Sequence, residues 1–319
     1  MLFSLYKSSL LLYNILANTN SRKGHFMHSQ KTRVGVVVII SFVMAALRAF
    51  LISGHLERST PDNNVYYLPE NIEITAFTVV AILFALLFIY LGISSGRKKV
   101  VCLKSFSSSV TIASSLLAFL LIGAALFYMV SLFSADAAFS LSSLLLFVLT
   151  LLSALVFLLS ALSNGNKRKS ESFLASAALI PIIFSAVRIL LDFIATSSAP
   201  MASSGAYHIV GLVAALLYFL AEGKSYVIET SAATFTSLGY VSIFFLLVYS
   251  LPNVILACLG SLVFDVQTAY SAVDLGIVVY IAVRLATSKS NRKIKFNEEA
   301  DQANEQTEAE APIEEPTAE

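Results

Sequence analysis

Residues 72–94 read IEITAFTVVAILFALLFIYLGIS, and this stretch decides the fold class. It contains a single charged residue, Glu73, and its apolar side chains fall on every face of a helix instead of along one stripe. A bilayer core about 30 Å thick is crossed by roughly 20 apolar residues in helical form. We therefore predict that the stretch spans a membrane as an α-helix, since a helix that is apolar all round is typical of membrane spans.

Seven further stretches share this character, and the composition of the whole chain agrees with them. The 319 residues are 57% hydrophobic and 13% charged, whereas soluble domains are about 45–50% apolar and about 25% charged. This balance excludes a soluble enzyme, a disordered scaffold, a coiled coil and a disulfide-stapled secreted domain. The period-2 alternation of barrel strands is not visible, so the predicted fold class is all-α, an integral membrane bundle of eight transmembrane helices. The other seven predicted spans are residues 34–54, 109–133, 139–162, 172–194, 207–221, 233–259 and 268–287.

The basic residues give these spans an orientation. Seventeen of the 21 Lys and Arg residues fall in the N-terminal segment, in the loops after the second, fourth and sixth spans, and after the eighth span. The loops on the opposite side hold only Arg58, while Arg48, Arg188 and Arg284 lie within spans. Because short cytoplasmic loops are enriched in Lys and Arg, we expect both termini to be cytoplasmic and the chain to reside in the cell membrane.

Residues 1–33 form a separate cytoplasmic segment before the first span. Their apolar part, residues 2–17, is too short to cross a bilayer and lacks the basic start and the small-residue cleavage site of a signal peptide. Two interpretations stay open. Either residues 1–33 contain an interfacial helix, or the true start is Met27, directly before the first span.

The two halves of the membrane region resemble each other. Residues 45–51 (AALRAFL) resemble residues 185–191 (SAVRILL), and two further pairs of segments match in the same order along the chain. This order predicts two tandem four-helix units, residues 34–165 and 166–288. An even number of spans in each unit gives both units the same orientation, as in some transporters with parallel repeats.

Four charges are predicted to meet at one depth of the bilayer. Arg48 and Arg188 lie about two-thirds of the way along spans that run outward. Asp192 follows Arg188 by one helical turn, and Asp274 lies near the outer start of the last span. An ionisable residue at the bilayer centre costs about 2.5–3.5 kcal/mol on insertion scales, so each requires a partner or a function. Arg48, Arg188, Asp192 and Asp274 are therefore the candidate ligand-binding residues.

Two interpretations of these charges stay open. In the functional one, they form a polar site beneath the outer mouth that binds a charged or zwitterionic ligand, or relays protons through Asp274. In the structural one, Arg188 pairs with Asp192, and Arg48 pairs with Asp274 to tie the two halves together. Buried ion pairs commonly fix helix arrangement without binding anything.

Residues of familiar catalytic and metal sites are few. The two cysteines, Cys102 and Cys258, fall on opposite sides of the predicted membrane, and zinc spacings, phosphate loops and nucleophile elbows are missing from the sequence. His208 lies near the outer face close to Asp192, and an acid–base or metal site at this position stays open as an interpretation. Otherwise we expect neither an enzyme nor a bound cofactor or metal.

Residues 289–319 form a basic and then acidic cytoplasmic tail. Each Lys or Arg near an anionic membrane surface contributes about 1 kcal/mol of attraction, so anionic lipid head groups are expected partners in addition to the lipid bilayer itself. Residues 298–319 hold nine acids and no base. This part is expected to be disordered and suits a cytoplasmic protein partner, whereas nothing in the chain indicates nucleic acid.

These features together predict a small-molecule transporter or permease-like protein, with a small-molecule substrate as a further partner. The alternative is a non-transporting membrane sensor, scaffold or assembly factor that acts through its loops and its acidic tail. Transport predicts a water-accessible cavity that reaches the four charges, whereas the alternative predicts a dry core in which the charges are paired.

Overall fold

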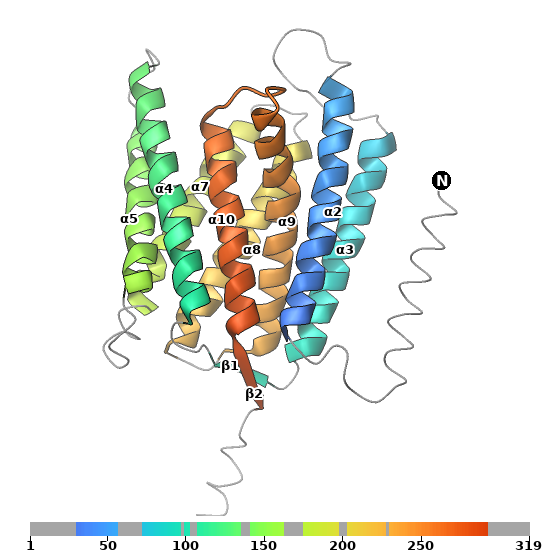
Figure 1. Cartoon of the computed structure of the whole chain (residues 1–319), viewed down its shortest axis with the longest axis vertical. Helices are drawn as coiled ribbons and strands as arrows, with labels where there is room; N and C mark the ends of the chain where they lie inside the picture. Colours follow the sequence, from blue (N-terminus) through green and yellow to red (C-terminus); the bar gives the residue numbers. More distant parts are fainter. Residues whose placement is uncertain are drawn as a thin grey trace, which may run out of the picture.

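Eight helices long and apolar enough to cross a membrane make up most of the described chain (Figure 1). The computed structural model describes residues 30–56, 72–96, 99–102, 107–134, 141–162, 175–197, 203–227 and 230–292. The helices are α2 (Gln30–Leu56), α3 (Ile72–Gly96), α4 (Ser108–Ser134), α5 (Leu141–Leu162), α7 (Leu179–Ser197), α8 (Ser203–Ser225), α9 (Ala232–Cys258) and α10 (Val266–Thr287). The predicted all-α bundle of eight spans is confirmed, and the chain has the architecture of a multi-pass membrane protein. Residues 1–29, Arg58 and the acidic tail lie outside the described residues.

Local sequence explains where several helices begin and end. Asp265 caps α10, because its side chain accepts a hydrogen bond of 2.8 Å from the backbone N–H of Thr268, as aspartate commonly does at helix starts. Two residues after the end of α9, Gly260 has a φ of +73°, the left-handed conformation that often ends a helix. The helix α8 extends past the predicted span 207–221 at both ends, and it therefore includes Glu222.

Helices α9 and α10 form the centre of the bundle. The helix α9 packs against α2, α3, α8 and α10, and α10 also packs against α4. The pair α4 and α5 lies on one side of this centre, and the pair α2 and α3 lies on the other (Figure 1). The helices of the predicted units 34–165 and 166–288 thus share one core, and the tandem repeat remains a prediction.

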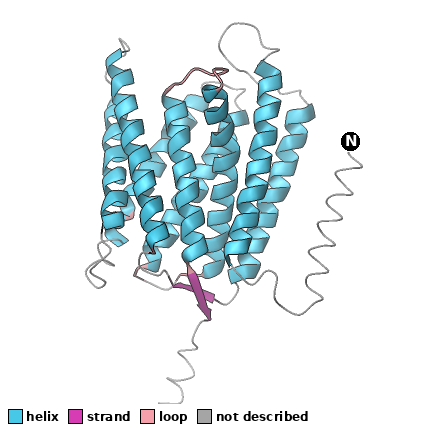
Figure 2. Ribbon diagram, in the orientation of Figure 1, coloured by secondary structure: helices cyan, strands magenta, loops and turns pink. Residues whose placement is uncertain are grey.

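A two-stranded antiparallel ribbon joins distant loops at one end of the bundle. Strand β1 (Lys99–Cys102) follows α3, and strand β2 (Lys289–Arg292) follows α10 (Figure 2). The linker before α9 joins them, since the N–H of Val101 donates to the carbonyl of Thr230 at 3.0 Å. We call this the ribbon end, and the other the far end. The loop after the second span and the segment after the eighth therefore lie on one side, as the distribution of basic residues predicts.

The register of the ribbon is testable because it places residue 289 opposite a native cysteine. Lys289 is the antiparallel partner of Cys102, and partner Cα atoms in such a pair are about 4.5–5.5 Å apart, within disulfide range. Lys289→Cys should therefore form an intramolecular disulfide with Cys102 under mild oxidation, detected by peptide mapping with and without reductant. Ser290→Cys is the matched control, because its partner is Val101. Equal crosslinking of both variants would contradict the register.

Candidate functional site

A buried salt bridge between Arg188 and Asp274 lies toward the far end of the bundle. Arg188 of α7 donates from Nη1 to Oδ1 of Asp274 at 2.6 Å and from Nη2 to Oδ2 at 3.2 Å. Both side chains are almost fully buried, and Asp274 also accepts a longer bond of 3.4 Å from the hydroxyl of Ser250 on α9. Two parallel bonds of this kind fix geometry as well as charge, so the pair orients α7 against α10.

His208 of α8 links this salt bridge to the edge of the bundle. Its Nε2 lies 2.8 Å from Oδ2 of Asp274, and its Nδ1 lies 3.1 Å from Oδ2 of Asp192. The Asp192 side chain is 32% exposed. A doubly protonated imidazole donates from both ring nitrogens, whereas a neutral one donates from a single nitrogen. His208 can therefore donate to both carboxylates at once only when its ring carries a positive charge.

Arg48 of α2 joins the same region through aromatic rings. Its guanidinium lies 4.8 Å from the ring centre of Tyr207 and 5.6 Å from that of Tyr249, and its Nη1 donates to the carbonyl of Val248 at 2.9 Å. The ring of Tyr249 in turn stacks on His208, with centres 4.2 Å apart. Aromatic faces attract cations, so these tyrosines hold Arg48 close to the histidine. We call Arg48, Arg188, Asp192, His208 and Asp274 the far-end network.

The structure brings all four predicted site residues into this network but pairs them differently. The one-turn spacing suggests Asp192 as the partner of Arg188, whereas Arg188 donates both of its described carboxylate bonds to Asp274, 86 residues later. Asp192 instead contacts His208. Nη1 of Arg48 donates to a backbone carbonyl of α9. His208 is the member whose central position was not predicted, although its proximity to Asp192 was.

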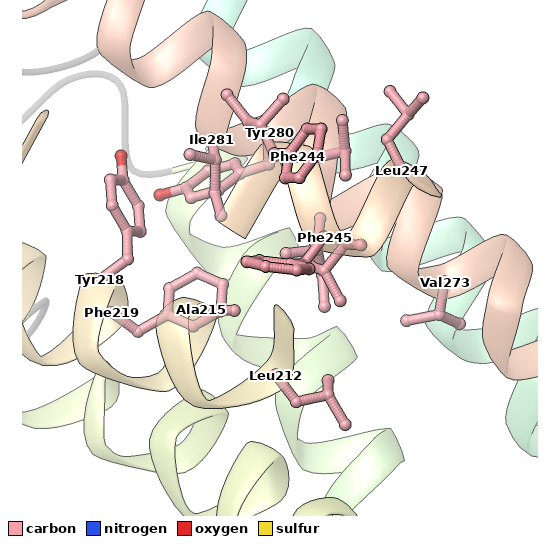
Figure 3. Packing of buried hydrophobic residues seen from close by; sticks show 14 of the residues in the cluster. Leu212, Ala215, Tyr218, Phe219, Phe244, Phe245, Leu247, Val273, Tyr280 and Ile281 are labelled. Carbon is pink, nitrogen blue, oxygen red and sulfur yellow. The ribbon is translucent and has the colours of Figure 1, made fainter. Parts of the chain in front are cut away.

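An apolar layer lies between the far-end network and the ribbon end. Leu212, Ala215 and Phe219 follow His208 along α8, and they are buried in one core with Phe244 of α9 and Ile281 of α10 (Figure 3). This layer occupies about two turns of α8, since each residue rises about 1.5 Å. Polar groups at the two ends of the bundle are thus separated by packed hydrocarbon.

A second charged cluster lies on the ribbon side of this layer. Glu222 of α8 accepts hydrogen bonds on Oε1 from Nε of Arg284 at 2.7 Å and from the hydroxyls of Tyr280 at 2.8 Å and Tyr226 at 3.3 Å. Arg284 also donates to the hydroxyl of Tyr226. Burial raises the pKa of Tyr226, which follows the end of α8, so its phenol stays neutral and can donate. We call these four residues the ribbon-end cluster.

The ribbon-end cluster was not predicted, because none of its residues, taken alone in the sequence, indicates a polar site. Arg284 is recognisable as an arginine within the last span, but Glu222 lies one residue past the predicted end of the sixth. An arginine within a membrane span requires a nearby anion. Glu222 is an acid that the predicted topology places on the same side of the membrane as Arg284. That requirement is the signal by which the pair could have been found.

Neither end gathers the residues of a metal site, since no group of three His, Cys, Asp or Glu able to hold an ion occurs in the described part of the chain. The far-end network carries both signs of charge, a titratable imidazole and a partly exposed carboxylate. Such a set can bind a charged or zwitterionic group or transfer a proton. No protein-family model, curated protein or solved structure matches this chain.

Proposed function

We propose that this chain is a small-molecule transporter or permease-like protein of the cell membrane, and that the far-end network is its solute-binding site. The convergence of ionisable side chains from α2, α7, α8 and α10 on one buried region carries this proposal. Ionisable residues at membrane depth are costly and commonly mark substrate or proton pathways. Asp192, the most exposed acid of the network, is where a solute would arrive.

The same contacts indicate which solutes fit. Arg188 suits a carboxylate or another anionic group, because its planar donors match two oxygens. Asp274 and Asp192 suit an ammonium group, and the rings of Tyr207 and Tyr249 suit a cation. A zwitterion that exchanged its own charges for the Arg188–Asp274 pair would therefore leave no buried charge uncompensated. The positive-inside rule would place the network toward the outer face, with both termini cytoplasmic, and we retain the parallel tandem repeat within this proposal.

The alternative is a non-enzymatic sensor, scaffold or assembly factor. The bidentate Arg188–Asp274 pair favours it, since a buried ion pair whose charges compensate each other can fix the arrangement of helices without binding a ligand. Such a protein would act through anionic lipid head groups at the cytoplasmic face and through a protein partner of the acidic tail. Transport and this alternative differ in what the pair must do, and a charge swap separates them.

Uptake by proteoliposomes tests the proposal. Labelled glycine, glutamate and lysine represent zwitterionic, anionic and cationic solutes, and we expect the wild-type protein to transport at least the zwitterion. His208→Gln should reduce that uptake roughly tenfold, equivalent to about 1.4 kcal/mol, because it removes the group that links the two carboxylates.

The swap Arg188→Asp with Asp274→Arg is the discriminating variant. It preserves the opposite charges of the pair but exchanges the sites of the anion-binding and cation-binding groups. A double variant that folds but does not take up solute would support a solute site. A double variant that both folds and takes up solute would indicate that the pair serves only to hold the helices together. A folded wild-type protein that transports none of the three solutes would favour the non-transporting alternative.

A further inference from the structure

Nε2 of His208 has two close neighbours of opposite hydrogen-bonding character. It lies 2.8 Å from Oδ2 of Asp274 and 3.3 Å from Nη2 of Arg188. An ionised carboxylate only accepts hydrogen bonds and a guanidinium only donates them. A protonated Nε2 can therefore donate to Asp274, and an unprotonated Nε2 can accept from Arg188. Because both states of this buried nitrogen have a partner, the ring can change its protonation without the cost of an unsatisfied polar group.

The other ring nitrogen of His208 faces the exposed edge of the far-end network. Nδ1 lies 3.1 Å from Oδ2 of Asp192, whose side chain is partly exposed, whereas the side chain of His208 is buried. When the neutral ring carries its single hydrogen on Nε2, Nδ1 is the nitrogen that can take up a second one. A hydronium ion that reaches Asp192 can pass its proton to Nδ1 and leave a water molecule behind. The ring then has an N–H group toward each carboxylate.

The surroundings of His208 can compensate a charge on its ring. The two carboxylate oxygens lie 2.8 and 3.1 Å from its nitrogens, whereas the nearest nitrogen of Arg188 lies 3.3 Å away. The ring of Tyr249 stacks on the imidazole with an interplanar angle of 14°, and aromatic faces attract cations. The ionisable groups around His208 and its direct neighbours are Arg188 and Asp192 from α7, Tyr249 from α9, Asp274 and Tyr270 from α10, Arg48 from α2 and Tyr207 from α8 itself.

Protonation of His208 changes the charge that the far-end network presents to a solute. The other members of the network are two arginines and two aspartates, Arg48, Arg188, Asp192 and Asp274, whose formal charges cancel. A neutral ring leaves this sum unchanged, and a charged ring adds one positive charge. Excess charge at a buried site is costly unless it is paired. A solute with one net negative charge supplies the pairing, whereas a zwitterion does not.

We propose that His208 is the proton-binding residue of the far-end network, and that a proton binds there together with a solute of one net negative charge, such as an amino acid with a carboxylate side chain. This inference rests on the proposed function, since it takes the network as the solute site and names the solute class and the accompanying ion. The two bind cooperatively, because each increases the affinity for the other by the same factor. Uptake of such a solute is then driven by a proton gradient that is acidic at the far end.

A variant whose only histidine is His208 tests proton binding directly. His25→Gln, His28→Gln and His55→Gln together leave one imidazole in the chain and change no residue of the far-end network. Nitrogen-15 NMR of its ring, in the full-length protein in nanodiscs, is followed from about pH 5 to about pH 9, a range that spans ordinary histidine titration. Saturating glutamate should raise the titration midpoint by about one pH unit, the shift that tenfold tighter binding to the charged ring produces. A midpoint that glutamate does not raise would overturn the proposal.

Proton uptake by the wild-type protein keeps the test decisive if the triple variant does not fold. Adding glutamate to the protein in weakly buffered solution with a pH indicator should remove protons from the solution. Glycine is the matched control solute, since it has the same ammonium and carboxylate groups but lacks the additional carboxylate. Equal proton uptake with the two solutes would contradict the proposed pairing of proton and anion.

Histidine variants assign this proton uptake to a residue. His208→Gln should abolish the uptake that glutamate causes, whereas the triple variant, which carries the same kind of change at the other three histidines, should retain it. Undiminished proton uptake in His208→Gln would contradict the assignment to His208.

Transport assays separate the failure of this inference from the failure of the proposed function. Proteoliposomes that take up glycine, but whose glutamate uptake does not respond to a proton gradient, would overturn the coupling and leave the proposed function intact. Proteoliposomes that take up neither solute would contradict the proposed function. A titration midpoint of His208 that glutamate raises would still support proton-linked binding in that case.

Discussion

Replacing Asp274 with alanine should lower the free energy of unfolding by about 3–5 kcal/mol, the range found when one partner of a buried ion pair is removed. Arg188 would keep its charge in a site that is almost fully closed to solvent, and His208 would lose the carboxylate that lies 2.8 Å from its Nε2. The measurement is thermal unfolding followed by circular dichroism, because the chain contains no tryptophan to report by fluorescence.

Two further variants decide whether the loss comes from the unpaired arginine. Combining Arg188→Met with Asp274→Leu removes both charges, and it should restore most of the stability, since apolar replacement of a buried pair is often neutral or stabilising. Asp192→Asn should cost less than Asp274→Ala, because the Asp192 side chain is 32% exposed whereas that of Asp274 is fully buried. Equal stability of Asp274→Ala and the wild-type protein would contradict the structural importance of the pair.

The spans could be predicted because hydropathy is a property of consecutive residues. The second predicted span, residues 72–94, begins where α3 begins and ends two residues before it. The sixth predicted span, residues 207–221, ends before α8 does, since Glu222 and Lys224 lower the apolar character of a helix that continues to Ser225. The tertiary contact with Arg284, which compensates Glu222, is not visible in a window of sequence.

Membership of the far-end network was predictable, but its pairing was not. Counting residues along each span predicts one membrane depth for Arg48, Arg188 and Asp274, and the structure links these residues through His208 and Tyr249. Which charges touch depends on how the helices rotate and pack, which is set by contacts between distant segments. The ribbon was missed for the same reason, because β1 and β2 are short strands almost 200 residues apart.

Gly92→Ala should destabilise the bundle by about 1–3 kcal/mol, the usual cost of overpacking a tight core. A Cβ at position 92 would lie 2.5 Å from the Cα and 2.6 Å from the backbone nitrogen of Ser237 on α9. Backbone atoms cannot rotate away, so α3 and α9 would have to separate. Small residues allow such close approach of helices in membranes, where packing replaces the hydrophobic effect as the force between them.

Gly123→Ala on α4 is the same change of residue type, but we expect it to have the opposite effect on stability. A Cβ there meets no atom within 4 Å, and glycine within a helix is less favourable than alanine by roughly 0.5–1 kcal/mol. Gly123→Ala should therefore leave the unfolding temperature unchanged or raise it, whereas Gly92→Ala should lower it. Because both changes add one methyl group to a predicted span, hydropathy and helix propensity cannot separate them. If the two substitutions change the unfolding temperature in opposite directions, the difference reports the contact between α3 and α9. Equal changes would show that these helices do not approach as closely as the structure places them.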